Sequence, residues 1–131
     1  MAHAQGTFHN DSWKEEVVQK LDGEARVTLA RIVQDFEGGL VGMCNWTSVM
    51  AYRADGTTAY TGFLRLVGRL GRRHGSFMVQ ADGAYDGDRA KISWRVVSGT
   101  GTEELRGLEG TGTAEAPHGP DGTYVLDYEV G

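Results

Sequence analysis

The chain has 131 residues, of which 40% are hydrophobic and 24% charged, and its formal net charge is -5. This length suits one domain with a single core, so residues 1–131 are taken as one domain. The negative charge argues against nucleic-acid binding, which needs a positive surface, and no apolar stretch is long enough to span a membrane. The N-terminus lacks the basic and apolar regions of a secretory signal, so a cytoplasmic location is expected.

Glycine-rich turns divide the chain into segments with the composition of β-strands. The sequence holds 20 glycines, and the pairs Asp55-Gly56, Asp86-Gly87 and Asp121-Gly122 favour tight hairpin turns. Between the turns, alternation of apolar and polar residues predicts eight strands, in chain order 6–11, 27–37, 40–53, 58–71, 75–86, 89–98, 104–116 and 122–130. Such a series forms an all-β antiparallel meander, and closure into an eight-stranded barrel removes its exposed edges.

Residues 12–22 carry two conflicting signals. Ser12 and Glu15 have the spacing of a helix-capping box, and Trp13, Val17 and Leu21 follow at intervals of four. A short helix explains both features, and an extended crossing strand is the alternative. Periodicity does not choose between them.

Alternation also predicts which side chains face the interior of the barrel. The predicted interior is aromatic and aliphatic, interrupted by the small residues Gly42, Cys44, Gly62, Gly68, Ala81 and Gly83. This mixture is typical of a ligand cavity, but small residues also let the layers of a filled core interdigitate, so both readings stay open.

From the inward set we predict a ligand-binding site without a metal or another cofactor. Cys44 is the only cysteine and the four histidines are scattered, so no metal-ligand spacing occurs. Tyrosine hydroxyls, with an ordinary pKa of about 10, would act as hydrogen-bond donors rather than bases. The predicted ligand-binding residues are Gln34, Trp46, Ser48, Met50, Tyr52, Tyr60, Leu64, Ala81, Trp94, Tyr124 and Tyr128.

Short motifs occur in a fixed order along nearly the whole chain. They include Gly6-Thr7-Phe8, Ser12-Trp13, Met50-Ala51-Tyr52 before Ala54-Asp55-Gly56, Gly62-Phe63, Gly75-Ser76-Phe77, Trp94 with Val96, Gly101-Thr102 with Glu104-Leu105, and Gly122 to Tyr128. Together they resemble a bacterial domain-of-unknown-function family with the allene-oxide-cyclase-like barrel. The resemblance implies a closed, calycin-like meander, and it implies no particular reaction.

Two positions depart from the pattern of that family. A typical member has a Glu where this chain has Leu64 and a His where it has Ala81, both on the inward face. An interior Glu–His pair would be an acid/base candidate, so its absence leaves a more apolar interior. Drift of a structural pair into an apolar core explains the change equally well.

Three functions fit this sequence. The first is a cofactor-independent cyclase or isomerase of a polyketide- or polyene-type metabolite, which would act by ordering its substrate. The second is a carrier for an apolar small molecule. The third is a structural module with a filled core, for which Val41, Met43 and Val49 would form an outer apolar patch that could join a homodimer. His118 is expected at the rim of the barrel, and Glu104 is expected to form structural hydrogen bonds.

Overall fold

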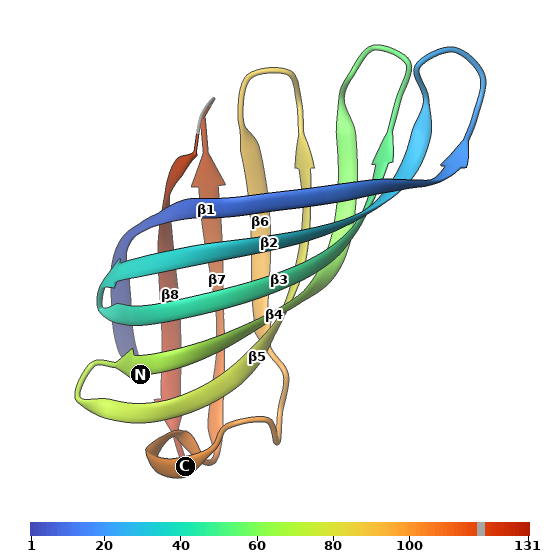
Figure 1. Cartoon of the computed structure of the whole chain (residues 1–131). Coiled ribbons are helices and arrows are strands. Elements are labelled where there is room, and N and C mark those ends of the chain that lie inside the picture. The colour runs from blue at the N-terminus through green and yellow to red at the C-terminus, as the bar shows by residue number, and fades with distance from the viewer. Residues whose placement is uncertain (118–119) are drawn as a thin grey trace.

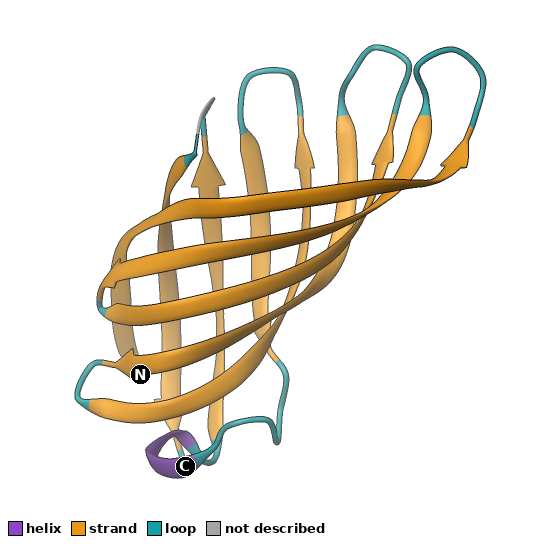
Figure 2. Cartoon of the chain, in the orientation of Figure 1, coloured by secondary structure: helices purple, strands orange, loops and turns teal. Residues whose placement is uncertain are grey.

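The computed structural model, described over residues 1–117 and 120–131, is a closed antiparallel barrel (Figures 1 and 2). Neighbours in the barrel are neighbours in the chain, and pairing of the first strand with the last closes the sheet. The predicted fold class is therefore confirmed, while His118 lies outside the described residues. The strands are β1 (Ala2–Lys20), β2 (Arg26–Gly38), β3 (Leu40–Tyr52), β4 (Thr58–Leu70), β5 (Arg73–Tyr85), β6 (Ala90–Val96), β7 (Leu108–Ala116) and β8 (Asp121–Val130).

Strand β1 is much longer than the predicted strand 6–11, and it resolves the ambiguity of residues 12–22. The segment is an extended strand through Lys20, so the helical alternative is wrong. A shift in register beside Asp11 reverses the alternation, and beyond it Trp13 lies opposite the buried Ile32. Residues four apart share a face in a strand as well as in a helix, which is why the spacing fits both.

The hairpin turns lie at the two ends of the barrel (Figure 1). The turns at 21–25, 53–57 and 86–89 form what we call the open end. The closed end holds the β2–β3 and β4–β5 turns and the connection 97–107. Apolar side chains fill the closed end, and those buried there include Leu40, Leu70, Phe77, Leu105, Leu108 and Leu126.

The connection 97–107 corrects two predicted strand boundaries. Strand β6 ends at Val96 and β7 begins at Leu108, because the intervening chain runs along β5 instead. The Thr102 N–H donates to the Ser76 carbonyl over 2.9 Å, and the Ser76 N–H donates to Thr102 Oγ1 over 3.0 Å. Ser76, which alternation places on the outer face, is therefore buried.

A one-turn 3-10 helix, η1 (Glu103–Leu105), lies within this connection. It places the Leu105 side chain in the core at the closed end, where only 1% of the residue is exposed. The Glu104 carboxylate accepts a hydrogen bond from the His74 N–H over 3.1 Å, which is the structural role expected for it. Helix η1 thus closes this end of the barrel.

Gly62 and Gly68, two of the small residues on the inward face, allow two strands to pack closely and do not make room for a ligand. A Cβ on Gly62 would lie 2.0 Å from the Thr47 carbonyl oxygen, and one on Gly68 would lie 2.1 Å from that of Val41. These distances are far below van der Waals contact. Both glycines therefore allow β3 and β4 to approach each other closely, and neither lines the cavity described below.

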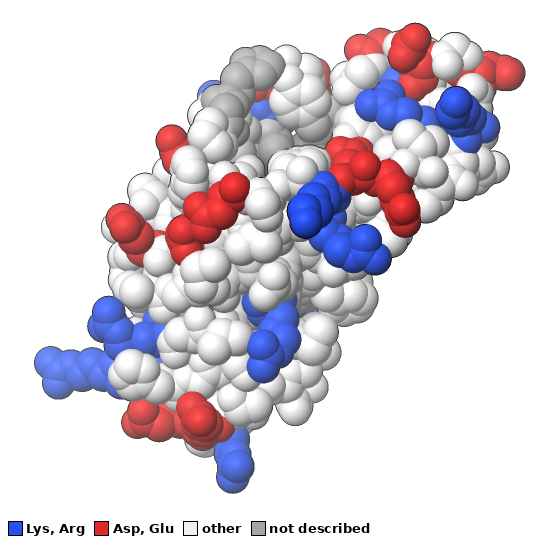
Figure 3. Space-filling model, in the orientation of Figure 1, with Lys and Arg blue, Asp and Glu red and all other residues white. Residues whose placement is uncertain are grey.

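Charged residues of both signs are interspersed over the face of the barrel seen in Figure 3. Among the described residues, no helix has the length and apolar character needed to cross a membrane. On the outer face of β3 and β4, the exposed apolar side chains are Met43, Val49, Phe63 and Val67, and Val41 is half-buried. The homodimer expected from this patch stays a prediction.

Candidate functional site

A cavity of about 230 Å³ occupies the half of the barrel nearest the open end. Its wall is mostly aromatic and aliphatic, because the alternating inward side chains of several strands converge on it. The lining residues are Phe8, Asn10, Trp13, Gln34, Trp46, Met50, Tyr52, Gly56, Thr58, Tyr60, Tyr85, Ala90, Ile92 and Ala116. Trp13 is 48% exposed, which places it at the mouth of the cavity.

An aromatic cluster lies between this cavity and the closed end. The ring of Phe36 lies 5.5 Å from that of Phe8, 5.7 Å from that of Trp94 and 5.1 Å from that of Tyr124. Above this floor is a second void of about 10 Å³, which borders Leu64, Ala81 and Trp94. The interior is therefore filled toward the closed end and hollow toward the open end. Composition alone did not distinguish a ligand cavity from a filled core, and the barrel contains one of each.

The predicted site residues separate into three groups. Gln34, Trp46, Met50, Tyr52 and Tyr60 line the large cavity. Leu64, Ala81 and Trp94 border the small void, together with Gln34 and Trp46. The remaining three, Ser48, Tyr124 and Tyr128, line neither space.

Residues of the third group have other contacts. The Tyr124 hydroxyl donates to the Glu37 carbonyl and accepts from the Leu40 N–H, each over 2.8 Å, and so holds the β2–β3 turn. The Ser48 hydroxyl donates to the Thr61 carbonyl over 3.3 Å. Tyr128 pairs with Gly110 on β7 and is half-buried.

Several lining residues were not among the predicted site residues. Tyr85, Ala90 and Ile92 face inward by the same alternation that identified their neighbours, so their signal was present in the sequence. Asn10 also follows from alternation within the first strand. Trp13 does not, because only the register shift beside Asp11 turns it inward.

The cavity wall has no charged side chain among the described residues, and its titratable groups there are tyrosines. Burial raises the pKa of Tyr60 to about 12. Burial and a hydrogen bond to Glu15 likewise raise the pKa of Tyr52 to about 12. At neutral pH both phenols are hydrogen-bond donors rather than bases.

Glu15, on β1, forms hydrogen bonds to residues at the mouth of the cavity. Its Oε2 accepts hydrogen bonds from Tyr52 and Thr28, each over 2.5 Å, and its Oε1 accepts one from the Trp13 indole over 2.8 Å. Partial burial acts to raise the pKa of Glu15, but these hydrogen bonds outweigh it and hold the pKa below the usual 4.5. The Arg26 guanidinium stacks 3.9 Å from the centre of the Tyr52 ring and completes the cluster.

This cluster should make the stability of the protein depend on pH. Folding lowers the pKa of Glu15, so its ionised carboxylate stabilises the folded state. This contribution to the free energy of unfolding is complete above pH 4.5 and is lost as the pH falls through the lowered pKa. The free energy of unfolding should therefore be higher for the wild type than for Glu15→Gln at neutral pH, and this difference should shrink in acid. Urea denaturation from about pH 7 to about pH 3 measures it.

Glu16→Gln is the matched control, because Glu16 is the exposed next residue of β1 and shares none of these hydrogen bonds. It should change the unfolding free energy by no more than about 0.5 kcal/mol. A difference between wild type and Glu15→Gln that does not change with pH would contradict the role assigned to the carboxylate.

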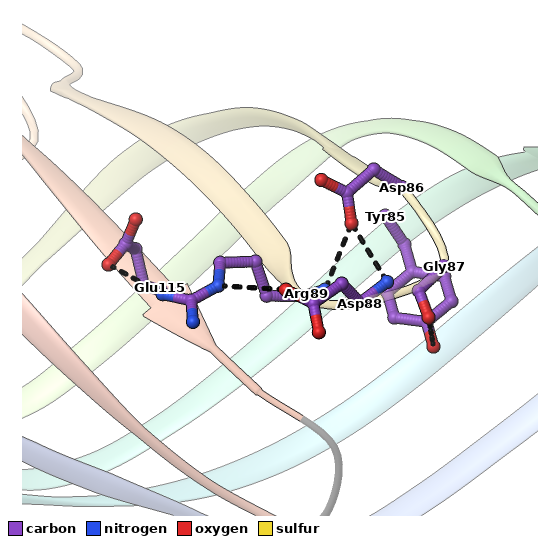
Figure 4. A network of polar contacts seen from close by, with 6 residues as sticks. All are labelled: Tyr85, Asp86, Gly87, Asp88, Arg89 and Glu115. Carbon is purple, nitrogen blue, oxygen red and sulfur yellow. Dashed lines mark hydrogen bonds and ion pairs between the residues drawn. The ribbon is translucent and has the colours of Figure 1, made fainter.

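A hydrogen-bonded turn connects β5 and β6 at the open end of the barrel (Figure 4). The Asp86 carboxylate accepts hydrogen bonds from the backbone N–H groups of Asp88 and Arg89 over 2.8 and 3.0 Å, and these bonds lower its pKa. The Arg89 side chain reaches Glu115 on β7 over 3.8 Å. The network holds the β5–β6 turn beside Tyr85, whose ring lines the cavity.

Comparison with known proteins places the chain in a family. The model of a protein family of unknown function, DUF3224, matches residues 4–128. The chain belongs to the DUF3224 family. The resemblance noted from the sequence motifs, to a family of unknown function with a barrel fold, is thereby confirmed.

A solved member of DUF3224 has the same fold. This member is a protein of unknown function from Shewanella oneidensis MR-1 with a crystal structure. It shares 25% sequence identity with this chain, and the two structures match with a TM-score of 0.82. The match covers 100% of this chain and 98% of that one. No curated protein matches the chain. DUF3224 membership establishes the barrel and assigns no activity.

Proposed function

We propose that this DUF3224 protein binds an apolar small molecule in the open-end cavity. The observation that carries the proposal is the contrast between the two halves of the barrel interior. Protein interiors are normally close-packed, and the closed end follows this rule, whereas side chains leave a cavity of about 230 Å³ above the aromatic floor. An apolar cavity of about 150 Å³ is already large enough to bind benzene.

The volume and the wall limit the class of ligand. The space suits a molecule, or the end of a longer one, of about two fused rings. Aromatic side chains such as Trp46 and Tyr60, whose rings meet edge to face at 5.8 Å, offer flat apolar contact surfaces. A longer ligand would leave the barrel past Trp13 and Gly56 at the mouth. The net charge of -5 does not favour a nucleic acid as a partner. As part of the same proposal, the ligand is bound in the cytoplasm and without a membrane partner.

A cofactor-independent cyclase or isomerase is the catalytic form of this proposal. A rigid wall that folds a flexible polyene or polyketide into a reactive conformer can lower a barrier by about 7–11 kcal/mol in favourable cases. The neutral wall supports catalysis by shape, aided by a hydrogen bond from Tyr60, over proton abstraction. Binding of such molecules without turnover would instead identify a carrier.

Naphthalene is a suitable first probe, and its dissociation constant can be measured by ligand-observed NMR. Ala90→Phe places a ring at the cavity wall and should weaken naphthalene binding at least tenfold, since a filled cavity has no room for the ligand. Ala84→Phe adds the same ring to the exposed outer face of the adjacent strand β5 and should bind like the wild type. A wild type that binds no naphthalene, or equal binding by both variants, would contradict the proposal.

A further inference from the structure

Two buried polar atoms at the cavity have no hydrogen-bond partner among the described residues. They are the Gln34 side-chain oxygen, Oε1, and the Trp46 indole nitrogen, Nε1. Gln34 is 3% exposed and Trp46 is 5% exposed, so both residues are more than nine-tenths buried. Burying a polar group without a partner destabilises the folded protein, and such groups are rare in native structures.

The two atoms need opposite kinds of partner. Nε1 of Trp46 can only donate a hydrogen bond, and Oε1 of Gln34 can only accept one. The Gln34 amide is held in place because its Nε2 donates to Asn10 Oδ1 over 2.8 Å. Gln34 and Trp46 both border the large cavity and the small void next to it. The end of a ligand placed where these two spaces meet would therefore contact both residues.

This pair restricts the chemistry of the group that it would bind. A carbonyl or ether oxygen satisfies Trp46 but leaves Gln34 without a partner. A charged amine or carboxylate would be buried without an opposite charge, because the described part of the wall carries none, and this costs far more than burying a neutral group. A hydroxyl group is neutral, donates one hydrogen bond and accepts others, and so meets both needs.

We infer that the ligand is an apolar alcohol or phenol whose hydroxyl group enters the barrel first and hydrogen-bonds to Trp46 and Gln34. This inference rests on the proposed function and adds the chemical class and orientation of the ligand. The apolar remainder lies against the aromatic wall, pointing to the mouth. A trapped water molecule is the competing occupant, because the small void of about 10 Å³ is close to the room that one water needs.

Ligand pairs that differ by one hydroxyl group test the inference. We expect the wild type to bind the better of 1-naphthol and 2-naphthol at least tenfold more tightly than naphthalene. Trp46→Phe removes the donor and Gln34→Met removes the acceptor, and each should reduce this preference to threefold or less. Gln80→Met makes the same exchange on β5 outside the cavity and should keep the preference of the wild type.

The outcomes separate the two proposals. If naphthalene binds and the naphthols bind no better, the cavity takes apolar molecules but the hydroxyl inference is overturned, as a retained water would cause. If the preference survives in either Trp46→Phe or Gln34→Met, the hydroxyl group does not bind both residues and the inference also fails. If neither naphthalene nor the naphthols bind, the proposed function fails together with the inference.

Discussion

Phe36→Ala should lower the free energy of unfolding by about 3–5 kcal/mol, as measured by urea denaturation. Phe36 is 2% exposed, and its ring packs against those of Phe8, Trp94 and Tyr124 in the floor of the cavity. Truncation removes these contacts and leaves a void that the surrounding side chains fill only in part by relaxing. For a domain whose total stability is about 5–15 kcal/mol, this is a large share.

Arg31→Ala is the control for this variant. Arg31 lies on the same strand, β2, with its side chain exposed, so its loss should change the unfolding free energy by no more than about 0.5 kcal/mol. A similar, small effect for Phe36→Ala would show that the aromatic floor is not packed as described. The cavity would then not have a fixed lower boundary.

Leu105→Ala should lower the unfolding free energy by about 2–5 kcal/mol. Leu105 is the apolar residue that η1 inserts into the closed end, and it is 1% exposed. Its removal leaves a void beneath the barrel core, far from the open-end cavity. Urea denaturation should report the loss of stability, while naphthalene binding measured at low temperature should be unchanged.

Arg106→Ala provides the comparison at the neighbouring position, because Arg106 is exposed. It should leave both stability and naphthalene binding close to the wild-type values. A Leu105→Ala protein that is as stable as Arg106→Ala would contradict the role of η1 in closing this end. A folded Leu105→Ala protein that no longer bound naphthalene would show that the two halves of the interior are not independent.

The inward residues of the regular strands could be predicted because each depends on local alternation alone. On β4, Tyr60, Leu64 and Leu66 are buried as alternation requires, and Trp46 and Met50 follow the same rule on β3. The hairpin order of the strands likewise follows from the spacing of glycine-containing turns. These features need no knowledge of which residues meet across the barrel.

Features that depend on pairing between distant residues could not be predicted in this way. The register shift beside Asp11 turns Trp13 inward, and nothing within residues 12–22 reveals it, because the shift is defined only against β2. Ser76 looks like an outward residue until Thr102 pairs with its backbone. Tyr124 faces inward as predicted, yet its hydroxyl is taken by the β2–β3 turn rather than left for a ligand.

The sequence by itself therefore determined the all-β class, the antiparallel meander and most of the apolar interior, since turn chemistry and alternation act over a few residues. Only the tertiary structure decided that the interior is filled at one end and hollow at the other. At the closed end, Leu105 packs beneath the aromatic floor. At the mouth, Ala90 pairs with Ala116, and their side chains are too small to fill the space above the floor. Packing between segments far apart in the chain sets the size of the cavity, and no local pattern encodes it.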